Sequence, residues 1–192
     1  TYHALRVETQ VLAAILRNLG IEKGDRVVIY MPMVPEAVIG MLACARIGAV
    51  HSVVFGGFAA NELATRIDDA KPKMVLSASC GLEPNRIVKY KPLLDEAIRL
   101  SSYKPDACLI LQRPQEEAAL LAGRDLDWAK ARDEAMISAN LVHDCVPVAA
   151  TDPLHPLHLW YHRAAQGRSA RQRRPPGCTQ MVDAKPLRRR AR

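Results

Sequence analysis

The chain has 192 residues, of which 49% are hydrophobic and 24% are charged. This length supports one well-buried domain, and the balance is that of a soluble globular protein, which excludes wholesale disorder. The longest uncharged stretch, Ile47 to Asn61, is shorter than the roughly 20 apolar residues of a membrane-spanning helix. The chain begins at Thr1, partway into an amphipathic pattern and with no signal peptide, so we expect a fragment of a longer protein.

The net charge of +7 is unevenly distributed along the chain. Residues 163–192 carry nine Arg and one Lys against a single acid, Asp183, which amounts to +9, whereas residues 1–162 amount to −2. A basic tail commonly indicates contact with nucleic acid or an anionic surface, so this possibility has to be weighed against an unstructured tail without a partner.

The five cysteines indicate structural thiols in a reducing compartment. They are odd in number, widely spaced, and form neither a CxxC pair nor a Cys/His set at metal-ligand spacing. They are Cys44, Cys80, Cys108, Cys145 and Cys178.

The first half of the chain alternates helical and strand patterns. A helix is predicted over Ala4 to Leu19, whose apolar residues share one stripe, with Gly20 as its stop. The β-branched run Arg26 to Tyr30 predicts a buried parallel strand. Pro35 suits the first turn of a helix that ends at Gly48, and a second strand is predicted over Ala49 to Phe55.

The pattern continues in the same way through the second half. A helix over Ala60 to Ala70 precedes a strand at Met74 to Ala78, and a helix over Pro92 to Leu100 precedes a strand at Ala107 to Leu111. Further on, a helix around Trp128 to Ala139 and a short strand at Cys145 to Val148 are expected. This alternation predicts βαβ units, and therefore an α/β fold with a parallel sheet covered on both faces.

In such a sheet, ligands bind beyond the carboxyl ends of the strands. Three loops are placed there: Met31 to Glu36, Phe55 to Phe58, and Cys80 to Arg86. We expect Met31 and Met33 in the first loop to pack in the core or line a tunnel rather than form a metal site. None of these loops contains a dinucleotide-binding GxGxxG or a P-loop sequence. Composition and periodicity therefore predict an α/β domain with a ligand site at the strand ends and go no further.

Three segments carry a family resemblance: Gly24 to Ala37, Ala43 to Phe58, and Asp144 to Val148. They resemble the AMP-forming acetyl- and propionyl-CoA synthetases of the adenylate-forming enzyme superfamily, and the match runs nearly unbroken from Thr1 to Leu154. Within that family, Phe58-Ala59, Glu62-Leu63 and Arg66-Ile67-Asp68 resemble the mitochondrial short-chain member 3 branch. Most members carry a Ser at the position of Ala59, where its hydroxyl would cap the next helix. Ala59 lacks a side chain that could provide this cap.

The resemblance implies a two-step ligation of a short-chain carboxylate, acetate or propionate, to coenzyme A. The carboxylate attacks the α-phosphate of ATP with Mg²⁺ present, and the thiol of coenzyme A then displaces AMP. It further implies a partial N-terminal domain of the adenylate-forming fold at residues 1–154, small-molecule partners, no membrane contact, and residence in the mitochondrial matrix, or otherwise in the cytoplasm.

The sequence departs from the family after Leu154, where members carry a phosphate-binding loop Tyr-Thr-Ser-Gly-Thr-Thr-Gly-Leu-Pro-Lys-Gly. Leu154 to Gly167 can be encoded by a set of codons in which a shift of the reading frame by one base gives Phe-Ile-Leu followed by this family loop, without a mismatch. We therefore expect residues 155–192 to be an out-of-frame, disordered, Arg-rich tail, and this argues against a nucleic-acid-binding role for it. The rival interpretation is a metal site of His155, His158 and His162, but it lacks an acidic partner.

By resemblance, the segment Glu83, Pro84, Asn85 and Arg86 contacts the 3′-phosphate end of coenzyme A, and Gly57 lies beside the pantetheine tunnel. A guanidinium suits a dianionic phosphate, although Glu83 stands where members often have a second Arg. The alternatives are a solvated turn at 83–86 and a tight strand-to-helix turn at Gly57. No catalytic residue and no metal ligand is expected within this chain.

Two classes of function remain at this point. One is a portion of an ATP-dependent acetate or propionate–CoA ligase that is inactive as this chain. The other is a non-catalytic α/β binding protein whose basic tail binds anions or nucleic acid.

Overall fold

Four apolar runs predicted as strands, together with a fifth short strand, pair into one five-stranded parallel sheet in a computed structural model that describes residues 1–56, 58–84 and 86–137. The described residues fall within one unit, Thr1–Ala149. The sheet has the order β2-β1-β3-β6-β7. Its strands are β1 (Arg26–Met31), β2 (Val50–Phe55), β3 (Met74–Ala78), β6 (Ala107–Leu111) and β7 (Asp125–Asp127).

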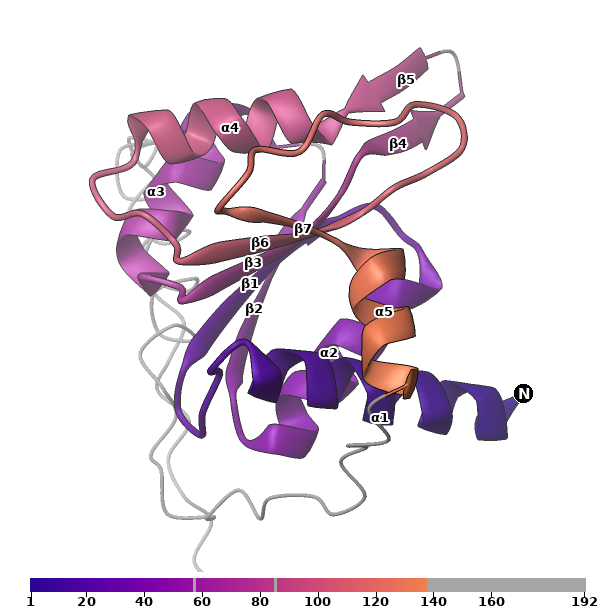
Figure 1. Ribbon diagram of the computed structural model, residues 1–192. Coiled ribbons are helices and arrows are strands. Elements are labelled where there is room, and N and C mark those ends of the chain that lie inside the picture. Colours follow the sequence, from indigo (N-terminus) through magenta and orange to yellow (C-terminus); the bar gives the residue numbers. More distant parts are fainter. Residues whose placement is uncertain (57, 85, 138–192) are drawn as a thin grey trace, which may run out of the picture. The chain divides into compact units, whose positions relative to one another are not determined.

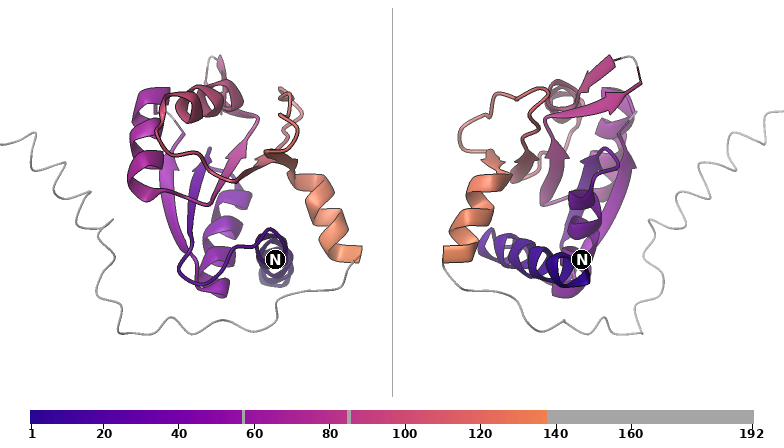
Figure 2. Two further views of the ribbon diagram at one scale, coloured as in Figure 1. Left: turned by 60° about the vertical axis from the view of Figure 1, so that its left-hand side comes forward. Right: turned by 90° about the vertical axis from the view of Figure 1, so that its right-hand side faces the viewer.

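Helices cover both faces of this sheet, as the alternation of strands and helices predicts (Figures 1 and 2). One face carries α1 (Tyr2–Asn18), α2 (Pro35–Ile47) and α5 (Trp128–Ile137). The other face carries α3 (Ala60–Ala70) and α4 (Tyr90–Leu100). The strands β1 and β3 are buried almost throughout, because both of their faces lie under helices.

Local sequence explains where the helices begin and end. Pro35 stands at the first helical position of α2, and Gly48 closes that helix in the left-handed conformation, with φ of 76°. Ala59 precedes α3 with extended backbone and makes no side-chain cap hydrogen bond, so the missing cap expected from the sequence is confirmed.

Two sequence predictions are wrong in detail. The segment Cys80 to Arg86, predicted as a loop, belongs to an antiparallel hairpin of β4 (Cys80–Glu83) and β5 (Arg86–Lys89). Leu82 and Ile87 are half exposed in this hairpin, so it lacks the apolar pattern by which a strand is recognised. Met33, expected in the core or a tunnel wall, is 96% exposed.

The short strand β7 was not predicted, because its sequence Asp-Leu-Asp has low β-propensity and tertiary pairing with β6 determines it. The predicted strand at Cys145 to Val148 and the basic tail lie outside the described residues. Among the described helices, none is long and apolar enough to cross a membrane.

Candidate functional site

The order of the strands places one topological switch point in the sheet, between β1 and β3. The connection from β1 to β2 runs through α2 on one face, whereas the connections from β2 to β3 and from β3 to β6 run through α3 and α4 on the other face. The chain therefore leaves β1 and β3 in opposite directions. In parallel α/β sheets, ligands bind at such a switch point, beyond the carboxyl ends of the strands.

Two tyrosines pack against each other at the carboxyl end of β1. Tyr30, near the end of β1, is fully buried, and its ring lies against that of Tyr90 with the centroids 5.1 Å apart and the planes tilted by 35°. The Tyr30 hydroxyl donates a hydrogen bond of 3.1 Å to the carbonyl oxygen of Phe58. Burial raises the pKa of Tyr30 to about 12, so the hydroxyl keeps its proton and remains a donor at neutral pH.

Two glycines allow the chain to pass close to Tyr90. A Cβ atom at Gly56, directly after β2, would lie 2.1 Å from the Tyr90 hydroxyl oxygen, and one at Gly81 in β4 would lie 2.7 Å from it. Any side chain at either position would overlap the ring. Gly56 and Gly81 thus bring the loop after β2 and the β4–β5 hairpin onto one aromatic side chain.

The hairpin holds the candidate residues that the sequence singled out around Arg86. Glu83 and Arg86 face each other at the ends of the paired strands, and the Arg86 Nε lies 2.7 Å from the Glu83 Oε2. Both side chains are exposed, at 42% and 71%, and Pro84 between them is exposed as well. Glu83 raises the pKa of Arg86, which keeps its positive charge. Gly57 and Asn85 lie outside the described residues.

The base of the hairpin is attached to the segment that follows β6. The backbone N–H of Arg113 donates to the Ser79 hydroxyl oxygen at 2.9 Å, and the Arg113 guanidinium donates to the carbonyl oxygen of Cys80 at 3.2 Å. Lys89 forms an ion pair of 2.7 Å with Glu116. These contacts hold the base of the hairpin while its tip stays open to solvent.

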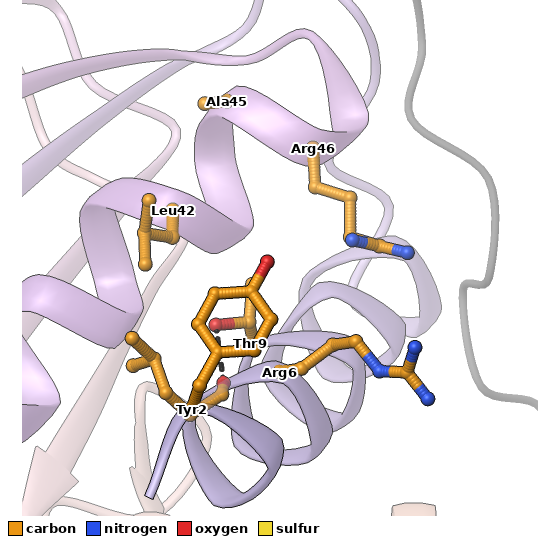
Figure 3. Close-up of a pocket in the computed structure, with 7 residues that line it drawn as sticks. Tyr2, Arg6, Thr9, Leu42, Ala45 and Arg46 are labelled. Atoms are coloured by element: carbon orange, nitrogen blue, oxygen red, sulfur yellow. Dashed lines mark hydrogen bonds between the residues drawn. The ribbon is translucent and has the colours of Figure 1, made fainter.

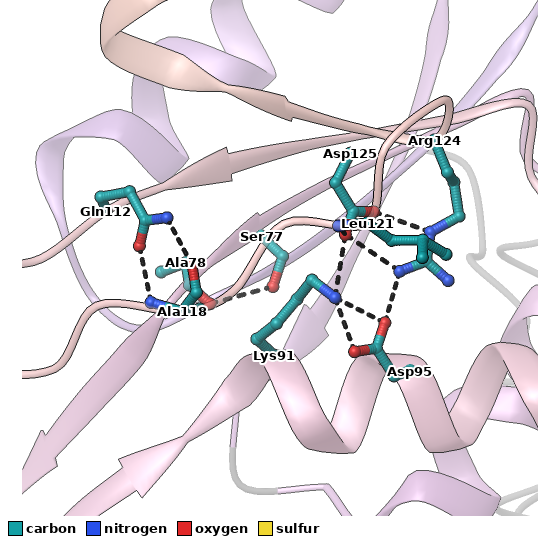
Figure 4. Close-up of polar contacts among 9 residues, drawn as sticks. All are labelled: Ser77, Ala78, Lys91, Asp95, Gln112, Ala118, Leu121, Arg124 and Asp125. Atoms are coloured by element: carbon teal, nitrogen blue, oxygen red, sulfur yellow. Dashed lines mark hydrogen bonds and ion pairs between the residues drawn. The ribbon is translucent and has the colours of Figure 1, made fainter.

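A buried ion network holds the first turn of α4, which follows the hairpin (Figure 4). The Lys91 Nζ lies 2.6 Å from Asp95 and 2.9 Å from Asp125, and Arg124 pairs with both carboxylates. Burial opposes ionisation of Asp125, yet its hydrogen bonds from Arg124, Leu121 and Lys91 leave its pKa below the ordinary value. Because these charges compensate one another, the network is structural and leaves no group free for a ligand.

Within the described residues, neither a cluster of metal ligands nor the thiols of Cys44 and Cys108 suggest a reactive site. No group of three His, Cys, Asp or Glu side chains in that part of the chain is placed to hold a metal ion. Burial raises the pKa of both the Cys44 and the Cys108 thiols to about 12, so neither is a thiolate at neutral pH. The inert packing role expected for Cys44 agrees with its complete burial.

A separate groove of about 320 Å³ lies between α1 and α2 (Figure 3). Its lining includes the apolar side chains of Leu5 and Leu42 and the basic side chains of Arg6 and Arg46. It involves the last turns of α2, before the chain enters β2, so it lies away from the carboxyl ends of the strands. It is therefore separate from the switch point between β1 and β3.

Sequence reasoning missed the residues that hold the hairpin in place. Tyr90, Gly56, Gly81 and Arg113 were not singled out, because each has an ordinary local interpretation and their contacts join segments distant in the chain. The available signals were a glycine within each of two predicted strand-end loops and a tyrosine two residues before the predicted helix at 92–100.

The comparisons with known proteins point to one family. The family model described as AMP-binding enzyme matches residues 1–158. The chain is 50% identical over 178 residues to the rat acyl-CoA synthetase short-chain family member 3, mitochondrial, covering 92% of this chain and 25% of the relative. The human protein of that name is 51% identical over the same length, with the same coverage.

A bacterial relative shows a similar level of identity. The propionate–CoA ligase of Escherichia coli is 48% identical over 134 residues, covering 70% of this chain and 21% of the relative. The chain thus spans about a quarter of the length of the curated relatives it matches most extensively. With more than half of its residues matched by the family model, this chain belongs to the AMP-binding enzyme family.

Proposed function

We propose that this chain carries the coenzyme A-contacting part of the N-terminal domain of an ATP-dependent ligase that joins a short-chain carboxylate, acetate or propionate, to coenzyme A. The observation that carries the proposal is the agreement between the relatives, which are named as short-chain acyl-CoA synthetases and propionate–CoA ligase, and the position of the hairpin at the switch point of the sheet. As in the relatives with a mitochondrial name, we place the parent protein in the mitochondrial matrix.

Arg86 is the residue we assign to the 3′-phosphate end of coenzyme A. Its guanidinium is exposed at the tip of the hairpin, and guanidinium groups form bidentate, charge-assisted hydrogen bonds with phosphate. Glu83 and Pro84, and with them Asn85 and Gly57, make up the rest of the proposed contact region. The carboxylate of Glu83 opposes an incoming phosphate, so binding has to displace the internal ion pair.

The residues that the structure describes do not fit ATP or Mg²⁺. They contain no glycine-rich phosphate loop and no set of three potential metal ligands, so we derive no adenylation step from them. In the parent enzyme, adenylation requires donors aimed at the charge that develops on the phosphates, and the loss of one such donor costs about 10²–10³ in rate. We therefore propose that the 192-residue chain alone does not catalyse ligation.

We also retain the proposal that residues 155–192 are translated out of frame. The family model ends at residue 158, close to the expected break at Leu154, although the alignments with the mitochondrial relatives cover 92% of this chain and continue past that break. Sequencing the transcript over codons 154–167 tests it directly. A transcript that lacks the family loop in the shifted frame would overturn it.

The function is tested in two steps. The first measures pyrophosphate release from ATP with acetate or propionate, comparing this chain with one restored to the shifted frame and extended to full length. We expect turnover from the restored enzyme only. Comparable turnover by the 192-residue chain would contradict the proposal.

The second step titrates the 192-residue chain with coenzyme A, ATP and an oligonucleotide, using backbone NMR spectra to detect weak binding. We expect coenzyme A to shift resonances around Arg86, and Arg86→Gln to abolish the shift. The matched control is Arg99→Gln, because Arg99 forms an equally exposed pair with Glu96 at the same spacing. Binding of the oligonucleotide without coenzyme A would favour the non-catalytic binding protein instead.

A further inference from the structure

We propose that Tyr90 is a positioning residue that sets the placement of the β4–β5 hairpin relative to the loop after β2. The proposal rests on the proposed function only in so far as these two segments contact coenzyme A. We infer that the side chain of Tyr90, at the start of α4, determines the spacing between the hairpin and the loop after β2, which are not paired in a common β-sheet.

The first argument is the closeness of both backbones to the tip of the Tyr90 ring. The 2.1 Å and 2.7 Å distances from the hydroxyl oxygen to Cβ positions built on Gly56 and Gly81 mean that both backbones contact this same atom. Further ring atoms lie within 2.9 Å of the Gly56 position and 3.2 Å of the Gly81 position. Neither segment can approach the other more closely unless the ring moves.

The second argument is that the ring itself has little freedom. Its face packs on Tyr30, which is fully buried, and the Tyr90 backbone N–H donates to the carbonyl oxygen of Ser79 at 3.0 Å. The next residue, Lys91, is held by its ion pairs with Asp95 and Asp125. The ring is therefore attached to the sheet, to the hairpin and to α4 together.

The third argument is that Tyr30, which packs against Tyr90, also contacts the loop after β2. The Tyr30 hydroxyl holds the carbonyl oxygen of Phe58, two residues beyond Gly56. The two tyrosines thus constrain this loop at both Gly56 and Phe58, on either side of Gly57. A ligand that contacts both segments gains affinity when their spacing is set before it binds, because no ordering cost remains.

The consequence for Arg86 follows from the register of the hairpin. Gly81 pairs with Val88, and Glu83 pairs with Arg86, so Arg86 sits about two strand residues, roughly 7 Å, beyond the point that rests on Tyr90. If the contact between Gly81 and Tyr90 changes, the position of Arg86 at the tip of the hairpin changes with it. We expect Tyr90→Leu to weaken binding of coenzyme A to this chain about tenfold, through Arg86 rather than through a contact of its own.

The test is a double-mutant cycle on the 192-residue chain with coenzyme A as the probe. If Tyr90 acts through Arg86, Arg86→Gln has a much smaller effect in the Tyr90→Leu background than in the original chain. Fully additive effects would overturn the proposal. Tyr103→Leu, a half-buried tyrosine in the connection between α4 and β6, is the control and leaves the affinity unchanged.

Amide hydrogen exchange without ligand separates this proposal from the proposed function. In Tyr90→Leu we expect amides of the hairpin, 80–89, to exchange at least about tenfold faster while those of β1 and β3 stay protected. Unchanged hairpin protection would overturn the positioning role, even if coenzyme A binds. Faster exchange without any coenzyme A binding to the original chain would uphold positioning and contradict the function.

A milder variant covers the case in which Tyr90→Leu does not fold. Tyr30→Phe keeps the stacked rings and removes only the hydroxyl that holds the Phe58 carbonyl. We expect faster exchange at backbone amides of the loop 56–59 with no change in the hairpin. Unchanged exchange in that loop would overturn the role of the aromatic pair.

Discussion

The guanidinium of Arg132 forms a two-point ion pair with the carboxylate of Glu8, which lies 124 residues earlier in the chain. The Nη2 lies 2.6 Å from Oε1 and the Nε lies 2.9 Å from Oε2, so the pair joins α5 to α1 on one face of the sheet. Its hydrogen bonds hold the pKa of Glu8 below the ordinary value, despite the opposing effect of burial.

Glu8→Gln is expected to lower the free energy of unfolding at pH 7 by about 0.5 kcal/mol, because both side chains are roughly one-third exposed and solvent screens the pair. A lowered folded-state pKa contributes stability above the unfolded-state pKa of about 4.3, and this contribution is lost as the pH falls through the folded value. Urea unfolding at pH 7 and at about pH 3 should therefore show the difference shrinking in acid. Glu117→Gln, at an exposed position, is the control, and a difference independent of pH would contradict this prediction.

The buried network at α4 predicts unequal effects for its two carboxylates. Asp125→Ala removes a side chain with no exposure and leaves Lys91 and Arg124 undercompensated, which should cost about 3 kcal/mol of unfolding free energy. Asp95 is 43% exposed, so Asp95→Ala should cost about 1 kcal/mol or less. Urea unfolding measures both changes in free energy. Equal losses would contradict the idea that the burial of Asp125 makes its ion pairs more important for stability.

The internal pair at the tip of the hairpin predicts a gain of affinity. Glu83→Gln releases Arg86 from its 2.7 Å ion pair, so binding of coenzyme A should strengthen by about two- to fivefold, the range expected for an exposed pair. NMR titration at low salt measures the change, and Glu96→Gln serves as the matched control. The gain should vanish in an Arg86→Gln background, and its persistence there would contradict the assignment of Arg86.

The uncapped start of α3 predicts a simple stabilisation. Ala59 has the extended backbone of an N-cap residue but no side-chain acceptor, so Ala59→Ser should raise the free energy of unfolding by about 1 kcal/mol. Thermal or urea unfolding measures this gain. Ala60→Ser, one position into the helix, should give none, and equal effects of the two substitutions would rule out capping as the cause.

The tail predicted to be out of frame has an expected signature in solution. Residues 163–192 combine a charge of +9 with few aliphatic side chains, so burial there cannot offset an ordering cost of roughly 1–2 kcal/mol per residue for the backbone. We expect amides beyond His155 to exchange without protection. Strong protection over this span would show an independent fold and would restore the histidine-rich segment as a candidate site.

Four strands of the sheet and most of its helices were predictable from the sequence alone, because their signals are local. Runs such as Arg26–Met31 and Met74–Ala78 are apolar enough to be buried on both faces, and Pro35 and Gly48 mark the ends of α2 through their own backbone preferences. The family resemblance added Arg86 and its neighbours. Their geometry stayed open, because an exposed turn of Glu83, Pro84 and Arg86 carries no apolar periodicity.

Tertiary structure alone decided how that turn is presented. The hairpin, with half-exposed Leu82 and Ile87, seats Gly81 against a tyrosine that comes from the following helix and also touches Gly56 of another loop. Such contacts depend on the switch point, where the connections after β1 and β3 leave toward opposite sides of the sheet, and this brings distant segments together at the carboxyl ends of the strands. Local propensity depends only on a residue and its neighbours in sequence. The position of the Tyr90 ring depends instead on the distant backbone at Gly56 and Gly81, where the absence of a side chain leaves room for it.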